Sequence, residues 1–386
     1  MTGRKGHAAP KAVYIHIPFC TNKCHYCDFN SYVVRGQPVD EYLEALEREM
    51  ELTVRKAPAR GIETVFVGGG TPTVLTPEQM RRFLLLVDTY FGDRADGFEF
   101  TMEANPGTTD PEKLRAMREG GVNRISFGAQ TFDNGLLAAI GRVHHADDIY
   151  RSVESARNAG FANISIDLMI GLPRQTLDTL ERTLDEALAL ALTHYSVYSL
   201  KIEENTLFHK LYERNELPLP DEEEELAMYL RVVERMREAG YGHYEISNFA
   251  RPGFECRHNT AYWRNESYYG LGAGAHGYVY GLRHVNVKGI REYIEATRSG
   301  LPVLESFEVT PEESMEDFMM VGLRLLNGVK DDDFRARYGI GMYDKFGGQI
   351  ARLVERGLLI ADESGCRLSE RGVLLGNEVF AEFIGG

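Results

Sequence analysis

The segment "YIHIPFCTNKCHYCDFN", residues 14–30, places Cys20, Cys24 and Cys27 within eight residues of one another. The chain of 386 residues has five cysteines, so most of its cysteine lies in this one stretch. Five cysteines, three of them clustered, do not make the framework of a disulfide-rich secreted protein, and in a reducing compartment such a cluster favours metal binding or catalysis. The spacing therefore predicts a metal or cofactor site directly after an apolar, strand-like segment.

Two kinds of metal site compete for these thiolates. A structural zinc ion usually takes four protein ligands in two separated pairs, and no second pair follows here. His25 lies inside the segment, but its place between Cys24 and Tyr26 makes chelation of the same ion awkward. An iron–sulfur cluster needs one thiolate for each iron unless one iron is left open. Three cysteines therefore favour a [4Fe–4S] cluster with one open iron, and three unligated cysteines are the remaining alternative.

Composition and charge limit the class of protein. No apolar run reaches the roughly 18 residues of a membrane span, and the first residues, "MTGRKGHAAPKA", lack the apolar stretch of a signal peptide. We therefore expect a soluble cytoplasmic protein. The net charge is −15 at pH 7, which argues against a nucleic-acid partner because phosphate binding needs a basic surface.

Short β-rich segments alternate with amphipathic helical segments through the first two thirds of the chain. Helical apolar spacing is clear in "VDEYLEALEREMELTV", "TPEQMRRFLLLVDTYF", "DPEKLRAMREGG" and "TLDTLERTLDEALALAL". This alternation predicts right-handed βαβ units around a parallel sheet. Six units are two fewer than the eight of a closed barrel, so we expect an α/β fold with a partial (βα)6 TIM-like barrel. The predicted strands are 13–17, 64–67, 98–103, 124–128, 163–170 and 195–202.

The composition divides the chain into three predicted parts. Residues 1–240 form the barrel, 241–300 a connecting segment that contains "HNTAYW", and 301–386 a C-terminal domain. In that domain three helical segments precede the hairpin-like "LLIADESGCRLSERG" and a last helix, which is the order of a winged helix. Because this domain is acid-rich, we expect packing or partner contact instead of DNA binding. The acidic run "DEEEEL", 221–226, is expected to be the solvated start of a helix.

The spacing C-x3-C-x2-C, with Tyr26 directly before the third cysteine, resembles the radical S-adenosylmethionine (SAM) superfamily. In that superfamily the amine and carboxylate of SAM chelate the open iron. One electron from the cluster then cleaves the sulfonium to give a 5′-deoxyadenosyl radical. The resemblance therefore implies SAM as a second cofactor and an electron donor of the flavodoxin or ferredoxin type as a partner.

The ends of the predicted strands test this resemblance independently, because functional residues of βα barrels collect at the carboxyl ends of the strands. The cysteine loop follows the first predicted strand, and "GGGTP", 68–72, follows the second, where bare backbone lets a ligand approach closely. Glu103 and Gln130 end the third and fourth, and Asp167 lies in the fifth. A carboxylate buried on a strand is costly without a partner. The sulfonium, ammonium and ribose diol of SAM would supply such partners.

Further motifs narrow the resemblance. "YIHIPFC", "GGGTP", "EANP", "GAQ", "GRVHH" and "IDLMIGLP" occur in order between residues 14 and 173 and resemble the oxygen-independent coproporphyrinogen III oxidase family and its relatives. The residue types suit SAM, since acids can hold its amine or hydroxyl groups and an arginine its carboxylate. Carried over by motif, the resemblance implies SAM contacts from Tyr14, Gly69, Gly70, Thr71, Glu103, Gln130, Arg142 and Asp167.

Two departures from the oxidase pattern bear on activity. The oxidase has a further cysteine two residues after its third, where this chain has Phe29. The oxidase also has a long N-terminal segment, and only thirteen residues precede Tyr14 here. Both departures resemble the sister group of HemW-type heme chaperones, which also carry the motif H-N-x-x-Y-W.

"HNTAYW", 258–263, matches that motif and contains the only tryptophan of the chain. The resemblance implies that heme is bound, that His258 ligates its iron, and that Tyr262 and Trp263 offer flat faces to the porphyrin. It also implies a heme-accepting protein as partner. Cys256 is a weaker candidate ligand, and we expect both Cys256 and Cys366 to be structural.

The sequence thus favours a heme chaperone that carries a [4Fe–4S] cluster and exchangeable SAM. A coproporphyrinogen III oxidase, or another radical enzyme acting on a porphyrin, is the alternative. A third class, a winged-helix regulator with a structural cluster, is disfavoured by the acidic charge.

Overall fold

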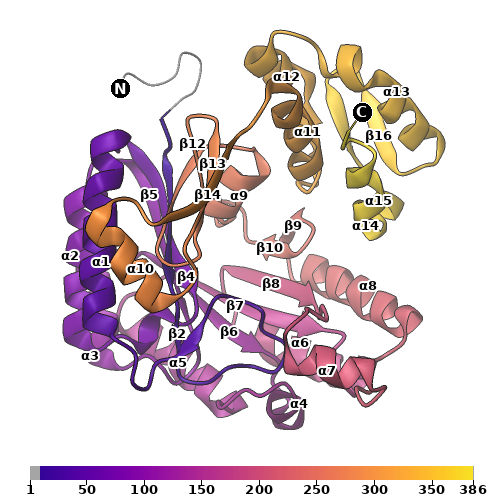
Figure 1. The fold of residues 1–386 in the computed structure, drawn as a ribbon. Coiled ribbons are helices and arrows are strands. Elements are labelled where there is room, and N and C mark those ends of the chain that lie inside the picture. The colour runs from indigo at the N-terminus through magenta and orange to yellow at the C-terminus, as the bar shows by residue number, and fades with distance from the viewer. Residues whose placement is uncertain (1–8, 386) are drawn as a thin grey trace.

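The architecture is a large mixed sheet covered by helices, followed by a small C-terminal domain (Figure 1). The structure is a computed structural model and describes residues 9–385. Within these residues no helix has the length and apolar character needed to cross a membrane.

The centre of the sheet is a run of six neighbouring parallel strands, which correspond to the six predicted ones. These strands are β1 (Ala12–Ile17), β4 (Ile62–Gly69), β5 (Arg94–Ala104), β6 (Arg124–Gln130), β7 (Asn163–Ile170) and β8 (His194–Ser199). The sheet has 12 strands and ends at β14 on one side and β9 on the other. The α/β fold with a partial barrel is therefore confirmed.

Both edges of the sheet are extended by strands that the sequence did not predict. β11 (Tyr268–Leu271) lies parallel to β1, and β12 (His276–Val279), β13 (Leu282–Asn286) and β14 (Val303–Glu308) follow it in antiparallel order. On the other side β10 (Asn248–Ala250) and β9 (Gly242–Glu245) pair beyond β8. Residues 241–300, expected to be a connecting segment, thus contribute five strands to the sheet. The division of the chain into three parts at residues 240 and 300 remains a proposal.

Helices cover the outer face of the sheet, and their first turns explain where they begin (Figure 1). α2 begins after Thr76, whose side chain and that of Gln79 form a capping box. Asp221 caps α8, whose first turn holds four glutamates, so the acidic run is the start of a helix as predicted. These helices are α1 (Val39–Lys56), α2 (Pro77–Phe91), α3 (Pro111–Glu119), α5 (Ala146–Asn158), α6 (Leu177–Ala189), α8 (Glu222–Glu238) and α10 (Ile290–Ser299). Two short helices, α4 (Asn134–Ala139) and α7 (Leu207–Glu213), pack beside the cysteine loop instead.

The C-terminal domain has its own hydrophobic core, which includes Phe318, Phe334 and Phe346. Three helices are followed by a β hairpin, in the order expected for a winged helix, and two short helices replace the single last helix of the prediction. The elements are α11 (Pro311–Gly322), β15 (Val329–Lys330), α12 (Asp331–Tyr338), α13 (Met342–Glu355), β16 (Leu359–Asp362), β17 (Gly365–Leu368), α14 (Glu370–Leu374) and α15 (Gly376–Ala381).

Candidate cofactor site

The cysteine segment forms a loop after β1, and a short strand at each end of the loop closes it. β2 (Phe19–Cys20) and β3 (Tyr32–Val33) pair in parallel. The Lys23 ammonium reaches across the loop and donates to the Phe29 carbonyl at 2.6 Å and to Ser31 Oγ at 2.8 Å. These bonds tie the first half of the loop to its second half and thereby restrict the positions of the three thiols.

All three thiols face one cavity of about 300 Å³ at the carboxyl ends of the parallel strands. Cys20, Cys24 and Cys27 are each half-buried and line this cavity. His25 is directed elsewhere, since its Nδ1 lies 3.0 Å from the Ala139 carbonyl. Among residues 9–385, no three His, Cys, Asp or Glu side chains are arranged around a single-ion site. The thiols thus share a cavity with room for a larger group.

The glycines at 68–70 bring the end of β4 against the cysteine strand. A Cβ atom on Gly69, where φ is +104°, would lie 2.3 Å from the His16 ring. A Cβ atom on Gly70 would lie 2.5 Å from the Phe19 carbonyl, which directly precedes Cys20. Any side chain there would therefore displace the cysteine loop. The glycine run is required by packing at this wall of the cavity.

A chain of hydrogen bonds runs around the cysteines. Arg142 donates to Tyr26 Oη at 3.0 Å and to Asn105 Oδ1 at 2.7 Å. Asn105 in turn donates to Thr71 Oγ1 at 2.8 Å, and the Thr71 hydroxyl lies 3.7 Å from Cys20 Sγ. The guanidinium is thus held at the cavity wall, where it can meet a negatively charged group.

Two carboxyl groups form another wall. Glu103 Oε2 accepts from the Gly69 amide at 3.3 Å, and Asp167 Oδ1 accepts from Ser126 Oγ at 3.1 Å. Burial and the neighbouring Asp167 raise the pKa of Glu103 to about 8. Burial also raises the pKa of Asp167. A positively charged ligand would lower the cost of ionising both groups, so this wall suits a cation.

All predicted SAM contacts except Tyr14 line the cavity with the cysteines; these are Gly69, Gly70, Thr71, Glu103, Gln130, Arg142 and Asp167. Gln130 reaches it from the end of β6 with a left-handed φ of 67°. Tyr14 is directed away from the cavity, since its hydroxyl lies 2.9 Å from His16 Nδ1 and its ring stacks on Phe66.

Several residues that line the cavity were not predicted from the sequence, and the polar ones include Asn105, Ser126 and Tyr198. Asn105 stands two residues after Glu103 in "EANP", so the strand-end rule applied one step further would have found it. Ser126 lies inside β6 and Tyr198 inside β8, and both face the cavity only because of the pleat of the strand.

The "HNTAYW" motif lies at the opposite end of β4. It forms most of α9 (Arg257–Trp263). His258 has no exposed surface, and its Nδ1 and Nε2 lie 2.8 Å from Thr64 Oγ1 and from Tyr262 Oη. Five residues of strand separate Thr64 from Gly69, which is about 16 Å. The motif and the cysteines therefore form two separate sites, and the histidine is enclosed.

The aromatic faces of the motif are also occupied. The Arg324 guanidinium lies 4.3 Å above the Trp263 ring, and Tyr262 packs edge-on against Tyr268 with 4.7 Å between centroids. Cys256 is buried at the start of α9 and Cys366 is buried in β17. Burial lowers the pKa of His258 to about 3, so its imidazole is neutral at physiological pH. In this conformation α9 therefore presents neither His258 nor an open Trp263 face to a porphyrin.

Comparison with known proteins agrees with this geometry. Residues 14–187 match the model of the radical SAM superfamily, and residues 309–375 match the HemN C-terminal domain. The chain is 48% identical to the heme chaperone HemW of Bacillus subtilis (strain 168) over 97% of its own length and 99% of that protein. It is 34% identical to the heme chaperone HemW of Escherichia coli (strain K12), over 97% and 98%.

Among solved structures, the coproporphyrinogen III oxidase HemN of Escherichia coli, a radical SAM enzyme, superposes with a TM-score of 0.84 at 25% identity. The match covers 98% of this chain and 90% of that one. The similarity to HemW thus extends over nearly the whole chain and includes both domains. The chain belongs to the HemW family of the radical SAM superfamily.

Proposed function

We propose that this protein is a heme chaperone, which binds heme and passes it to an acceptor protein. The main observation in support of this proposal is the residue at position 29. The Phe29 side chain lines the mouth of the cysteine cavity and is 62% exposed, at the place where the oxidase pattern has a further cysteine. The relatives named heme chaperone HemW support the same reading over nearly their full length. A cytoplasmic location stays a prediction.

The proposal includes a [4Fe–4S] cluster on Cys20, Cys24 and Cys27, with SAM at the open iron. The shared cavity, the bare backbone at Gly69 and the two flanking acids support it. When bound, these groups would supply a one-electron reductant and a cleavable sulfonium. Glu103 and Asp167 would hold the positive end of SAM and Arg142 its carboxylate. An electron donor of the flavodoxin or ferredoxin type belongs to the proposal if SAM is cleaved.

His258 is the proposed iron ligand. Its low pKa keeps the imidazole neutral, which is the form that ligates iron. Ligation requires His258 to give up its bond to Thr64 or to Tyr262 and to leave its enclosed position. The proposal therefore contains a conformational step, in which α9 moves away from β4 when heme binds.

A two-armed experiment tests the chaperone against the oxidase, which the fold similarity to HemN favours as the second candidate. The reconstituted protein is incubated anaerobically with heme in one arm. In the other arm it receives coproporphyrinogen, reductant and SAM. We expect retained heme that can be passed to an apo-acceptor such as apomyoglobin, and no vinyl product. Stoichiometric decarboxylation of coproporphyrinogen, without heme retention, would replace the chaperone by the oxidase.

A further inference from the structure

A second, larger cavity lies beside α9 at the amino ends of β1 and β4, which is the opposite end of these strands from the cysteines. Its volume is about 1020 Å³, in the upper range of known ligand sites, against about 300 Å³ at the cysteines. Ala12 and Thr64, near the starts of β1 and β4, form one wall. Ala261 of α9 and Leu325, from the segment after α11, form others. The cavity is therefore shared between the large sheet, the "HNTAYW" helix and the C-terminal domain.

Cationic side chains outnumber carboxylates by one at the rim of this cavity, in a chain that is acidic overall. Four cationic side chains line it against three carboxylates, Glu63, Glu255 and Glu266, whereas the whole chain has a net charge of −15. Lys11 and Arg257 both pair with Glu63, at 2.9 and 3.2 Å. The other two cations, Arg264 and Arg367, form no ion pair within 4.0 Å among residues 9–385, although Glu266 attracts Arg264 and Asp362 attracts Arg367 from farther away. Both guanidinium groups can therefore exchange a distant carboxylate for one of a ligand.

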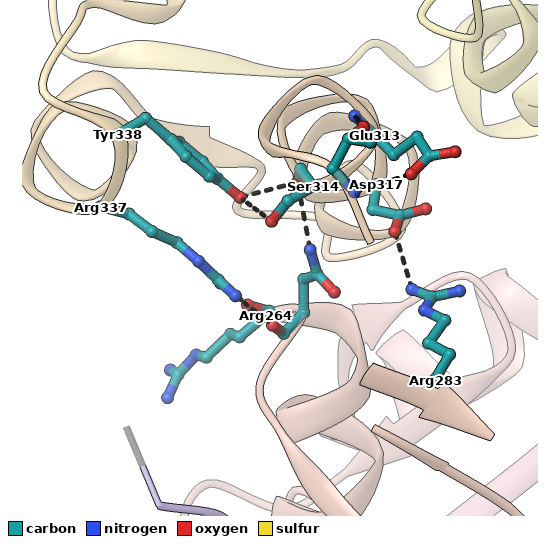
Figure 2. A network of polar contacts seen from close by, with 9 residues as sticks. Arg264, Arg283, Glu313, Ser314, Asp317, Arg337 and Tyr338 are labelled. Atoms are coloured by element: carbon teal, nitrogen blue, oxygen red, sulfur yellow. Dashed lines mark hydrogen bonds and ion pairs between the residues drawn. The ribbon is translucent and has the colours of Figure 1, made fainter. Parts of the chain in front are cut away.

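The C-terminal domain fixes the backbone from which Arg264 projects. Arg337 donates to the Arg264 carbonyl at 3.1 Å and to the Asn265 carbonyl at 2.6 Å, and the Asn265 amide donates to the Ser314 carbonyl at 3.2 Å. Figure 2 shows the Arg264 side chain extending away from this network, with no contact drawn to its guanidinium. The backbone of Arg264 is therefore held, while its guanidinium has no contact drawn to it. Because the backbone is already ordered, a ligand that binds the Arg264 guanidinium has to order only the side chain.

We propose that this cavity receives heme, with its two carboxylates on Arg264 and Arg367. Planar guanidinium groups bind carboxylates through paired, charge-assisted hydrogen bonds. The apolar ring would pack against Leu326, which lines the cavity and is half-buried, since Ala12, Ala261 and Leu325 are themselves buried. This inference rests on the proposed heme-chaperone function and places the ligand of that function.

The position of His258 fits this placement. Thr64 lines the cavity, and its hydroxyl is the group that holds His258 Nδ1. Arg257 also lines the cavity, and successive helix residues are about 100° apart around the axis. A turn of α9 by about that angle would bring the imidazole toward the cavity. Arg264 caps the C-terminal end of α9 and would move with this turn, whereas Arg367 lies in β17 and would not. The Arg367 contact can therefore be tested separately from iron ligation.

The test titrates heme and heme dimethyl ester, which has the same ring without free carboxylates, into wild type, Arg264→Gln, Arg367→Gln and the double variant. Arg151→Gln, an exposed arginine on α5 outside the cavity, is the matched control. Soret absorbance and quenching of Trp263 report binding, and thermal unfolding checks the fold. We expect heme affinity to fall about tenfold for each single variant and about a hundredfold for the double. The ester should bind wild type and the double variant equally.

Heme binding by the folded double variant at wild-type affinity would overturn the placement while leaving the chaperone function intact. Equal binding of heme and of its ester by the wild type would overturn it too, and this comparison needs no variant. A wild type that binds no heme would instead refute the proposed function, and the placement with it.

Discussion

Two sites lie at the two ends of β4, and one is an open cavity whereas the other is enclosed. At the carboxyl end, around Gly69, thiols, acids and an arginine already surround a cavity. At the amino end, Thr64 holds His258 of α9 buried against the sheet, with both ring nitrogens bonded. The first site is assembled because strand ends converge in any βα barrel. The second is closed by specific tertiary bonds, which can be broken. The difference indicates a fixed cofactor site and a ligand site that opens.

The cost of opening can be bounded from the contacts. Moving α9 breaks one or both bonds of His258 and strains those of Arg337 to the backbone after the helix. Each such bond contributes about 1 kcal/mol net. These bonds set a lower limit of a few kcal/mol on the cost of opening, because the ring contacts of His258 with Phe66 and of Tyr262 with Tyr268 are lost as well. The burial of a porphyrin face can offset part of this cost.

The largest expected effect is on the assembled site. Replacing Cys20, Cys24 or Cys27 by Ala should abolish cluster assembly, because each remaining pair of thiolates leaves a second iron without a protein ligand. Anaerobic reconstitution of the wild type should give about four irons and four sulfides per chain. Cys366→Ala, in the C-terminal domain, is the control and should leave the iron content unchanged. One zinc per wild-type chain without inorganic sulfide would contradict the cluster.

The next effect is on the closed site. His258→Ala should shift or remove the Soret band of the heme complex, because the proposed axial ligand is lost. Heme titration followed by absorbance measures this. Since the substitution also leaves Thr64 and Tyr262 without a buried partner, we expect a loss of about 1–3 kcal/mol in unfolding free energy.

Thr64→Val separates the two consequences. It removes a hydrogen bond of His258 and keeps the imidazole, so it should lower stability while preserving the Soret position. It should also ease opening and strengthen heme binding slightly. A Soret band unchanged in His258→Ala would show that this histidine is structural and only stabilises α9.

A smaller effect is expected for the acids at the assembled site. Glu103→Ala or Asp167→Ala should weaken SAM binding by about 1–3 kcal/mol with unchanged iron content, since neither carboxyl is a cluster ligand. Calorimetric titration of SAM into the reconstituted protein measures this. Unchanged affinity in both variants would make the acids structural.

The pH dependence of SAM binding sharpens this prediction. The pKa of Glu103 in the free protein is raised to about 8, so the group is largely protonated at neutral pH. A cationic ligand prefers the carboxylate, and binding therefore releases a proton. Affinity should rise with pH toward about 8 and level off above it. Glu103→Gln should flatten this rise; a rise of the same size in that variant would assign it to another group.

The smallest effect concerns what holds the second site shut. Arg337→Ala removes two hydrogen bonds to the backbone after α9 and should raise amide hydrogen exchange in residues 257–265. We expect a change of about 1 kcal/mol in local opening free energy. Exchange in the cysteine loop should not change. Equal increases in both segments would mean that the variant loosens the whole fold.

The difference between the two ends of β4 also explains which features the sequence could predict. The barrel strands alternate with long amphipathic helices, so periodicity was enough to place them. The cysteine loop and Glu103 lie at strand ends, where topology alone brings them together. The short strands β9, β10 and β12 carry too few residues for a clear period, and only pairing with the sheet edges defines them.

The state of His258 could not be predicted for a related reason. Its partners Thr64 and Tyr262, and the Arg324 that covers Trp263, depend on how α9 and the C-terminal domain pack against β4. A motif specifies residue types but not whether tertiary contacts enclose them. The position of Arg264 also had no signal in the sequence, because its backbone is held by interdomain hydrogen bonds from Arg337 (Figure 2).

One measurement tests the central claim, that heme is held apart from the cluster. Heme is titrated into the variant in which Cys20, Cys24 and Cys27 are all Ala, with the wild type and Arg264→Gln/Arg367→Gln in parallel. We predict a wild-type Soret band and affinity for the cluster-free variant and weakened binding for the double arginine variant. Heme binding that disappears with the cysteines and survives loss of both arginines would contradict separate sites and would place the heme in the cysteine cavity.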